Sequence, residues 1–377
     1  MLAAYLERIP STGVAVIPRA FPSFLAGILL LPLPLPASDD VPAAWLTPRQ
    51  AGTLLVDNLL QREYMYYGDE ALHYAEAAAA VGALRFAAAI GDAGMQERII
   101  VRYLPLLDDA GGLVSRRAHV DMNVIGIVPL QVAVATGDAT QRAQGLSFAD
   151  AQWAETLPSG LTAQSRWWID DLYMVGMLQM EAWRASGNLV YADRAAAQLT
   201  AYLPRLQNDD GLFFHSPDVP ILWGRGNGWV AVAMAEVLAD LPAGHPQREF
   251  LLSAYRRMMR TLLGYQGEDG MWRQILDYPE AWAESSGTAM FAYAMALGLN
   301  HSLLPPAPYR PAVERAWLAL TGLLDPAGNL AEVCIGTAKE NAVDYYLARP
   351  RVSGDLHGQA PMLWLATALL GPGFESS

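Results

Sequence analysis

The chain has 377 residues, of which 53% are hydrophobic and 17% are charged. This composition allows a large buried core and argues against intrinsic disorder. The net charge is -13 and no basic stripe is present, so a nucleic-acid partner is not expected. The only cysteine, Cys334, excludes an intrachain disulfide and a zinc site built from several cysteines.

Residues 1–40 differ from the rest of the chain. Arg8 and Arg19 precede an apolar run over 21–31, and prolines then alternate with leucines up to Ala37. The run is too short to cross a bilayer as a helix, so no membrane span is expected. It resembles an export signal with a small residue before the cleavage point, and the alternative is an apolar arm packed on the domain. The signal interpretation favours a periplasmic or secreted protein over a cytoplasmic one.

No linker divides the remaining chain, so residues 41–377 are predicted to form one domain. Two marks recur along it. The first is a glycine followed by Asp or Asn after an apolar helix, at Gly91, Gly137 and Gly187, which is typical of a helix C-cap. The second is a glycine-containing turn that leads into a leucine or methionine. These apolar positions are 113, 161, 212, 271 and 330, so they lie 48, 51, 59 and 59 residues apart. Such a period indicates one repeated supersecondary unit.

The segments between the marks are predicted to be helices. Apolar segments are expected to be inner helices, buried nearly all round: 75–89, 178–185, 230–241 and 288–299. Segments with charges on one face are expected to be outer helices: 96–103, 191–206, 247–263 and 312–323. With an N-terminal pair over 48–63 and 71–89, they give about six hairpins. Six hairpins that close on themselves form an all-α (α/α)6 barrel. An open solenoid is the alternative, but it would not bring the polar clusters to one point.

Acidic and aromatic residues follow the glycine turns in successive units. They are His119, Asp121 and Asn123, then Trp167, Trp168, Asp170, Asp171 and Tyr173, then His215, Trp223, Arg225 and Trp229. In a closed barrel, these positions lie at one end and surround a single funnel. Capping of helix N-termini would explain the polar residues singly, but it does not predict the excess of Trp and Tyr.

Asp170 is the predicted acid/base catalyst. Aromatic neighbours desolvate its carboxylate, which is expected to raise its pKa. Neighbouring residues on a helix point about 100° apart, so Asp171 cannot face the same cavity and is predicted to be an N-cap or a surface charge. Asp121 then supplies the second carboxylate. Two carboxylates are the usual equipment for cleaving a glycosidic bond.

The segment 223–229 reads Trp-Gly-Arg-Gly-Asn-Gly-Trp and is not a phosphate loop, because no strand precedes it and it has no lysine. Its glycines are predicted to let the backbone turn tightly, so that Arg225 and two indoles converge. Arginine binds a carboxylate through a bidentate fork, and indoles stack on sugar faces. Because the acidic protein repels an anionic substrate, Arg225 is the expected local cation. A packed tight turn is the structural alternative.

The histidines carry less information. His215 could donate to a substrate hydroxyl, although a lone histidine is more often structural, and no role is assigned to His73, His119 or His357. Neither a histidine pattern of a catalytic zinc site nor a serine-nucleophile elbow occurs.

Several of these motifs, in this order, resemble glycoside hydrolase family 105, the unsaturated rhamnogalacturonyl hydrolases. The resemblance to family 88, the unsaturated glucuronyl hydrolases, is more distant. It runs from about residue 70 to 370 and rests on these segments: 119–123, 168–174, 211–215, 223–229, 270–274, 282–291 and 355–358. The resemblance implies an (α/α)6 barrel that removes a 4,5-unsaturated uronic acid from the non-reducing end of lyase-generated oligosaccharides.

The resemblance also implies that the double bond is hydrated, and that the aglycone is not displaced directly. Asp170 would protonate C4 and help water add at C5, after which the hemiketal opens and expels the remaining sugar chain. Asp121 would support this proton transfer. The implied or expected substrate contacts are His215, Trp223, Arg225, Trp229, Asn123, Trp168 and Tyr173. No metal or organic cofactor is implied.

One departure from the family stands at 72–76, which reads Leu-His-Tyr-Ala-Glu where many members carry a tryptophan. Three alternatives stay open. An inverting glycosidase would use Asp121 and Asp170 on saturated glycans, and a sugar 2-epimerase would use His215 and His357. A non-catalytic sugar-binding barrel would not need Asp121, Asp170 and Arg225 together.

Overall fold

The computed structural model describes residues 45–68, 71–107 and 118–374. The predicted export signal or arm over 1–40 and the glycine turn that leads into residue 113 lie outside these ranges.

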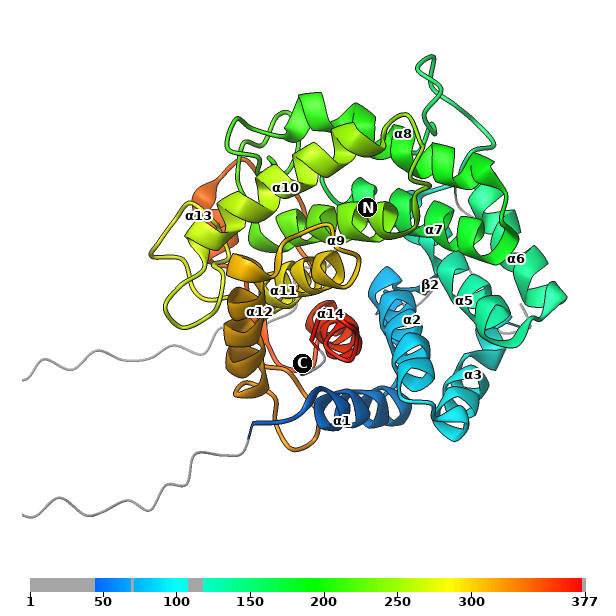
Figure 1. Ribbon diagram of the computed structural model, residues 1–377, viewed down its shortest axis with the longest axis horizontal. Coiled ribbons are helices and arrows are strands. Elements are labelled where there is room, and N and C mark those ends of the chain that lie inside the picture. The colour runs from blue at the N-terminus through cyan, green and yellow to red at the C-terminus, as the bar shows by residue number, and fades with distance from the viewer. Residues whose placement is uncertain (1–44, 69–70, 108–117, 375–377) are drawn as a thin grey trace, which may run out of the picture. The chain divides into compact units, whose positions relative to one another are not determined.

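An inner ring of helices surrounds the barrel axis. Its members are α2 (Tyr74–Ala89), α5 (Ile127–Thr136), α7 (Asp171–Ser186), α9 (Gly224–Asp240), α11 (Ser285–Asn300) and α14 (Leu356–Ala368). Each packs on the next, and α14 packs back on α2, so the ring is closed (Figure 1). The predicted (α/α)6 barrel is confirmed, and an open solenoid does not describe this part of the chain.

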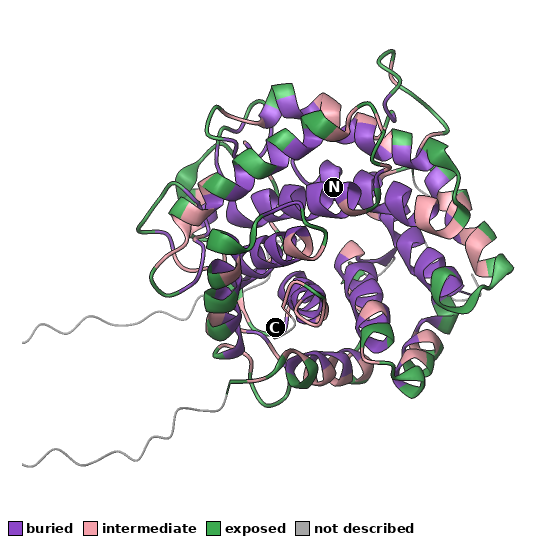
Figure 2. Cartoon of the chain, in the orientation of Figure 1, coloured by how far each residue is buried: buried purple, intermediate pink, exposed green. Residues whose placement is uncertain are grey.

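Outer helices cover the ring. They are α1 (Pro48–Gln61), α3 (Ala93–Leu107), α6 (Ala139–Ala151), α8 (Leu189–Leu206), α10 (Arg248–Tyr265) and α12 (Pro306–Thr321). The ring helices are buried nearly all round, whereas the outer helices expose one side to solvent (Figure 2). In α8, for example, the buried residues Ala192, Ala195, Leu199 and Leu203 recur every three or four positions, which places them on one helix face.

The predicted N-terminal hairpin is wrong in its pairing. Helix α1 packs mainly on α14, at the other end of the chain, and only weakly on α2. The outer side of α2 is already covered by α3, whereas no outer helix follows α14 among the described residues. The first and last helices therefore complete the sixth hairpin together.

The glycine marks end helices and turns as predicted. Gly137 ends α5 with φ +78°, a left-handed conformation that costs glycine little, and Asp138 then caps α6 by accepting from Thr140 N. Gly211, at φ +95°, forms the turn before the buried Leu212. Among the described residues, the two marks therefore correspond to a helix end and a glycine turn.

Short elements stand before several inner helices. Strands β1 (Tyr66–Tyr67) and β2 (Ala71–Leu72) pair antiparallel ahead of α2, and α4 (Val120–Asn123) with η2 (Val124–Gly126) precedes α5. Strand β3 (Val333–Cys334) pairs antiparallel with β4 (Arg351–Val352), with α13 (Val343–Leu347) between them. None of the described helices combines the length and the hydrophobicity that a bilayer crossing needs.

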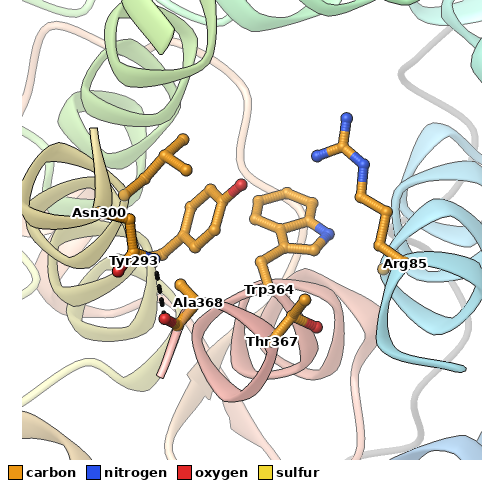
Figure 3. A pocket seen from close by; sticks show the side chains of 8 residues that line it. Arg85, Tyr293, Asn300, Trp364, Thr367 and Ala368 are labelled. Carbon is orange, nitrogen blue, oxygen red and sulfur yellow. Dashed lines mark hydrogen bonds between the residues drawn. The ribbon is translucent and has the colours of Figure 1, made fainter. Parts of the chain in front are cut away.

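Buried charges lie toward the end of the ring where the inner helices α2, α7 and α9 finish. Glu236 accepts from Arg85 Nη1 at 2.7 Å and from Arg184 Nη2 at 2.7 Å, and Glu181 accepts from both arginines. A cavity of about 290 Å³ lies beside them, lined by Arg85, Tyr293, Trp364 and others (Figure 3). Since none of the predicted site residues lines it, this cavity is not the candidate active site.

Candidate active site

The predicted site residues meet where the inner helices begin. Asp121 lies on α4, Asp170 immediately precedes α7, and Arg225 lies in the first turn of α9. Side-chain contacts then connect residues that are 45 or more positions apart in the chain. The convergence at one rim, expected from the repeats, is therefore present.

Asp170 faces His215 across the site. Its Oδ2 lies 3.6 Å from His215 Nε2, and neither atom has a hydrogen-bond partner among the described residues. On the other side of the ring, His215 Nδ1 lies 2.6 Å from the hydroxyl of Tyr346, which also accepts from Glu340 N. If the Tyr346 hydroxyl donates to Nδ1, the remaining imidazole proton is on Nε2 and points toward Asp170.

The expected rise in the pKa of Asp170 is not found. Burial raises this pKa, but the nearby His215, with Arg166 and Arg225 beyond, lowers it below the usual value. The prediction counted the aromatic walls and missed His215 and the two arginines behind them. Asp170 is therefore ionised in the free protein at neutral pH.

Arg166 is a site residue that the sequence analysis missed. Its Nη1 and Nη2 donate to the two oxygens of Asp121 at 3.0 and 3.1 Å, and its Nε donates to Asp171 at 2.8 Å. Arg166 therefore ties α4 to the start of α7. Its place directly before Trp167-Trp168 was a usable signal, but spacing alone did not show that it lies between two carboxylates.

Asp171 is structural, as predicted, but it is neither an N-cap nor a surface charge. It is fully buried and accepts from Arg166 N at 2.7 Å, from Trp168 N at 3.3 Å and from the Tyr202 hydroxyl at 2.7 Å. Burial raises its pKa, although Arg166 and Tyr202 oppose this effect. These bonds fix the segment that carries Trp168 and Asp170.

The two adjacent tryptophans point in different directions. Trp167 adopts a φ of +61° and stacks on Tyr202 at 4.6 Å between ring centroids. Trp168 is half-buried and lies edge-on to His215 at 5.7 Å, with Arg166 over its ring at 5.0 Å. Of the pair, Trp168 is the one that lies at the site.

The 223–229 segment is not a tight turn, which corrects that expectation. Helix α9 begins at Gly224, and Arg225 to Trp229 form its first turns. Glycine is required because neighbours come very close. A Cβ on Gly224 would lie 2.6 Å from the carbonyl oxygen of Arg273, and one on Gly228 would lie 2.5 Å from Met290 Sδ. The glycines therefore seat the helix against its neighbours.

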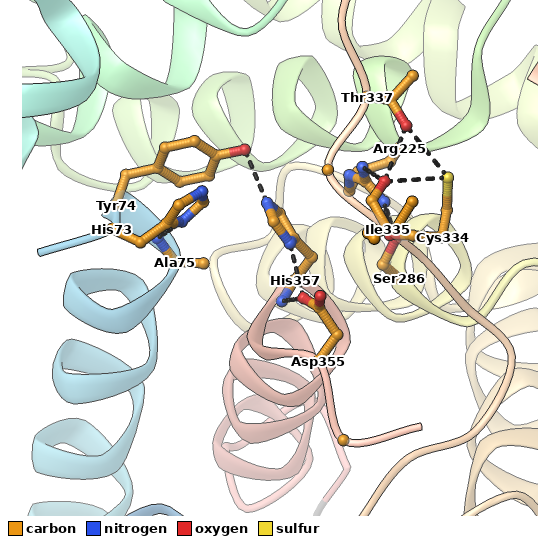
Figure 4. A network of polar contacts seen from close by, with 12 residues as sticks. His73, Tyr74, Ala75, Arg225, Ser286, Cys334, Ile335, Thr337, Asp355 and His357 are labelled. Carbon is orange, nitrogen blue, oxygen red and sulfur yellow. Dashed lines mark hydrogen bonds and ion pairs between the residues drawn. The ribbon is translucent and has the colours of Figure 1, made fainter. Parts of the chain in front are cut away.

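Arg225 is fully buried and holds the loop after β3. Its Nη1 donates to the carbonyl oxygen of Cys334, and its Nη2 donates to that of Ile335 at 2.9 Å (Figure 4). Glu284 binds the main chain of the same residue, since it accepts from Cys334 N at 3.0 Å. The guanidinium fork is thus directed at main-chain carbonyls. Arg225 forms no ion pair with a carboxylate of the described residues, so its positive charge is not neutralised by direct contact.

The other predicted contacts are deeply placed. The exposed fraction is 1% for Trp223, 0% for Trp229, 2% for Tyr173 and 5% for Asn123. Trp223 lies between His215 and Arg225, and Trp229 packs on Tyr173 at 4.5 Å. In the free protein these rings back the site wall, and their contact with a sugar stays a prediction.

The unassigned histidines also have defined positions. His73 and His119 are the N-caps of α2 and α4, where their side chains accept from Ala75 N and Asp121 N. His357 lies at the start of α14, with its Nε2 2.8 Å from the Tyr74 hydroxyl and its Nδ1 2.7 Å from Asp355 (Figure 4).

The chain belongs to Glycosyl Hydrolase Family 88, whose model matches residues 57–371. The resemblance stated from the motifs is thereby confirmed. A solved structure from Salmonella enterica, described as a possible member of family 105, shares the fold with a TM-score of 0.76 and 19% identity. That likeness covers 90% of this chain and 99% of the other.

Two curated relatives are more similar in sequence over shorter stretches. Unsaturated 3S-rhamnoglycuronyl hydrolase of Alteromonas sp. (strain LOR) is 29% identical over 180 residues, 44% of each chain. The protein of the same name from Formosa agariphila is 38% identical over 128 residues, 33% of this chain and 34% of that one. The matches therefore span less than half the length of these relatives.

Proposed function

We propose that the protein removes a 4,5-unsaturated uronic acid from the non-reducing end of oligosaccharides by hydrating the C4=C5 double bond. The observation that carries this proposal is Asp170, a buried carboxylate with one oxygen free of hydrogen bonds to the described residues, in a family of glycosyl hydrolases. The names of both curated relatives, which are hydrolases of unsaturated glycuronyl compounds, support the same substrate class.

Asp170 acts as the general acid at C4. It is ionised in the free protein, so it must gain a proton before it can donate one. A bound uronate brings a second negative charge and removes water, and both effects raise the pKa of a nearby carboxyl group. The substrate therefore prepares its own proton donor. After C4 is protonated, water adds to C5 and the hemiketal opens to release the remaining sugar.

Asp121 positions the reacting groups. Both of its oxygens already accept from Arg166, so it is a poor base for activating a water. This pairing makes an inverting glycosidase, with Asp121 as base and Asp170 as acid, the less supported alternative. In the proposed mechanism the Asp121–Arg166 pair orients the substrate as it approaches Asp170.

The substrate is bound by the residues around Asp170. Trp168, which is half-buried and lies beside His215, is the proposed platform for a sugar face. His215 Nε2 can donate to a substrate oxygen as well as toward Asp170. Arg225 supplies positive charge for the uronate carboxylate, because none of the described carboxylates pairs with it directly. Asn123, Trp223, Trp229 and Tyr173 shape the wall behind these groups.

The test is an assay with oligosaccharides generated by a polysaccharide lyase, followed by the ultraviolet absorbance of the double bond. Saturated oligosaccharides of the same composition serve as the control. Loss of absorbance with unsaturated ends only, together with release of the next sugar, supports the proposal. Cleavage of the saturated control would establish an ordinary glycosidase instead. An unchanged mass with altered sugar stereochemistry would establish an epimerase.

A further inference from the structure

Tyr74 is one end of a three-residue hydrogen-bonded chain beside the candidate site. Its hydroxyl lies 2.8 Å from His357 Nε2, and His357 Nδ1 lies 2.7 Å from Asp355 Oδ1 (Figure 4). His357 is 1% exposed, whereas Tyr74 is half-buried. His357 is therefore the shielded middle member, and a ligand can reach the chain only at one of its two ends, Tyr74 or the partly buried Asp355.

The surrounding bonds determine which atoms carry protons. Asp355 Oδ1 accepts from the His357 backbone N–H at 2.8 Å, and the pKa of Asp355 is held low by His357 despite burial, so Asp355 is ionised. A carboxylate beside Nδ1 places the imidazole proton there, which leaves a lone pair on Nε2. The Tyr74 hydroxyl then donates to Nε2. Its remaining lone pairs are acceptors that face away from His357.

Tyr74 is within electrostatic reach of the proposed catalytic groups. Burial raises its pKa well above the usual value, Arg225 lowers it, and Asp170, Asp121 and Asp355 raise it. Its ring also lies edge-on to Trp229 at 5.9 Å, which places it in the aromatic wall of the site. Because a free phenolate is strongly disfavoured, Tyr74 can give up its proton only as it gains another.

We propose that Tyr74, backed by His357 and Asp355, accepts the proton of the water that adds to C5, so that acid and base are two different groups. This inference rests on the proposed function. Tyr74 is the catalytic residue because it contacts the water, whereas His357 and Asp355 are positioning residues that act through it.

The π electrons of C4=C5 take the proton of the protonated Asp170 to form the C4–H bond, and the water oxygen bonds to C5. One O–H bond of that water breaks, and its proton passes to Tyr74 Oη while the phenolic proton passes to His357 Nε2. The products are the C5 hemiketal, an Asp170 carboxylate and a His357 imidazolium next to Asp355. Transfer of one proton from His357 to Asp170 through solvent restores the starting state.

This division of roles has a pH signature. The charged and titratable groups around Tyr74 and His357 come from several elements. They are Asp355 and His357 itself, His73 at the start of α2, Tyr67 of β1, Arg225, and the carboxylates Asp121 and Asp170. Protonation of His357 removes the acceptor for the Tyr74 proton, so kcat should fall on the acid side. Deprotonation of Asp170 in the complex should lower kcat on the alkaline side.

The experiment measures kcat and KM on an unsaturated disaccharide from about pH 5 to 9, so that both limbs of the pH profile are sampled. Tyr74→Phe keeps the ring contacts and removes only the hydroxyl. We expect kcat to fall about 100-fold or more, the usual size of a lost acid/base group, with KM within about threefold and the acid limb flattened. His357→Gln, which keeps an acceptor but cannot take a proton, should lose a similar factor.

The matched control is Tyr255→Phe. The Tyr255 hydroxyl is also buried and donates to the carbonyl oxygen of Ala294 at 2.8 Å, but it lies between α10 and α11 outside the site. This variant should lower Tm without changing kcat or the pH profile. A Tyr74→Phe enzyme with kcat within about threefold of wild type and an unchanged acid limb would overturn the proposal.

The remaining outcomes are also decisive. Near wild-type kcat in His357→Gln with a large loss in Tyr74→Phe would reduce Tyr74 to a substrate hydrogen bond and reject the relay. If His357→Gln does not fold, Tyr74→Phe and its pH profile decide the matter alone. If the wild-type protein leaves the double bond intact, the proposed function itself fails. If the wild type and Tyr74→Phe are both active, only the role of Tyr74 fails.

Discussion

Arg166 forms a two-point contact with Asp121, with Nη1 and Nη2 lying 3.0 and 3.1 Å from the two carboxylate oxygens. The same guanidinium reaches Asp171 through Nε at 2.8 Å, so one side chain sets the distance between two units of the barrel. A two-point contact fixes orientation as well as separation, which a lysine cannot reproduce.

Arg166→Lys should therefore lower kcat by about 10- to 100-fold while the protein stays folded, because a small displacement of Asp121 misaligns the reacting groups. Activity on the unsaturated disaccharide and Tm are the measurements. Arg310→Lys, in an exposed pair with Glu314, is the control and should keep kcat unchanged. Equal activity in both variants would show that the contact of Arg166 with Asp121 matters no more than an exposed ion pair.

Asp170→Asn should abolish turnover and leave the fold intact. The amide keeps the size of the side chain but has no proton to donate to C4. Loss of double-bond absorbance measures the first effect, and Tm with circular dichroism measures the second. Nearly full activity in this variant would reject the mechanism.

Arg225→Ala should weaken binding of the unsaturated uronate about tenfold more than binding of its methyl ester. The reason is the Coulomb attraction between the buried guanidinium and the uronate carboxylate. An attraction of about one to two kcal/mol corresponds to roughly a tenfold change in affinity. Competition assays with the two compounds give the comparison. Equal losses would mean that Arg225 acts only by holding the carbonyls of Cys334 and Ile335.

Glu236→Gln should destabilise the protein at neutral pH and change its response to acid. Burial raises the pKa of Glu236, but Arg85 and Arg184 lower it by more, to about 2 from the usual 4.5. A carboxyl group whose pKa is lower in the folded than in the unfolded protein stabilises the fold at any pH above the unfolded-state pKa. This contribution is lost as the pH falls from about 4.5 toward 2.

The Tm difference between wild type and Glu236→Gln should accordingly be large at pH 7 and shrink below about pH 4.5. Glu314→Gln, at the exposed pair with Arg310, should show almost no difference at either pH. A Tm gap for Glu236→Gln that stays constant down to about pH 3 would contradict the role of its ionisation.

The architecture was predictable because its signals are local. A left-handed glycine such as Gly137 and an N-cap such as Asp138 are determined by their own segment, and their spacing reveals the repeat. The partner of α1 was not predictable in this way. Adjacency in sequence favoured α2, but the packing surface left open in the ring belongs to α14.

The sequence predicted which residues lie at the site better than it predicted their contacts and protonation. Asp170, His215 and Trp168 were found because acidic and aromatic residues recur at one point of the repeat. The direction of the Asp170 pKa shift was missed, since it depends on His215 and Arg225 from other segments and on the side-chain position of the nearby Arg166. The helical form of 223–229 was missed because glycines suggest a turn. Here their missing side chains leave room for the close approach of Arg273 and Met290.

The pairing of α1 with α14 has a consequence for the order of folding. Contacts between the first and last described helices join residues about 300 positions apart, and such closure is slow because it must wait for the intervening chain. During synthesis, the segment that carries Asp355 and His357 emerges after the other inner helices. The barrel can therefore be nearly complete while one wall of the site is still missing, and the emerging chain should gain activity only at the final step.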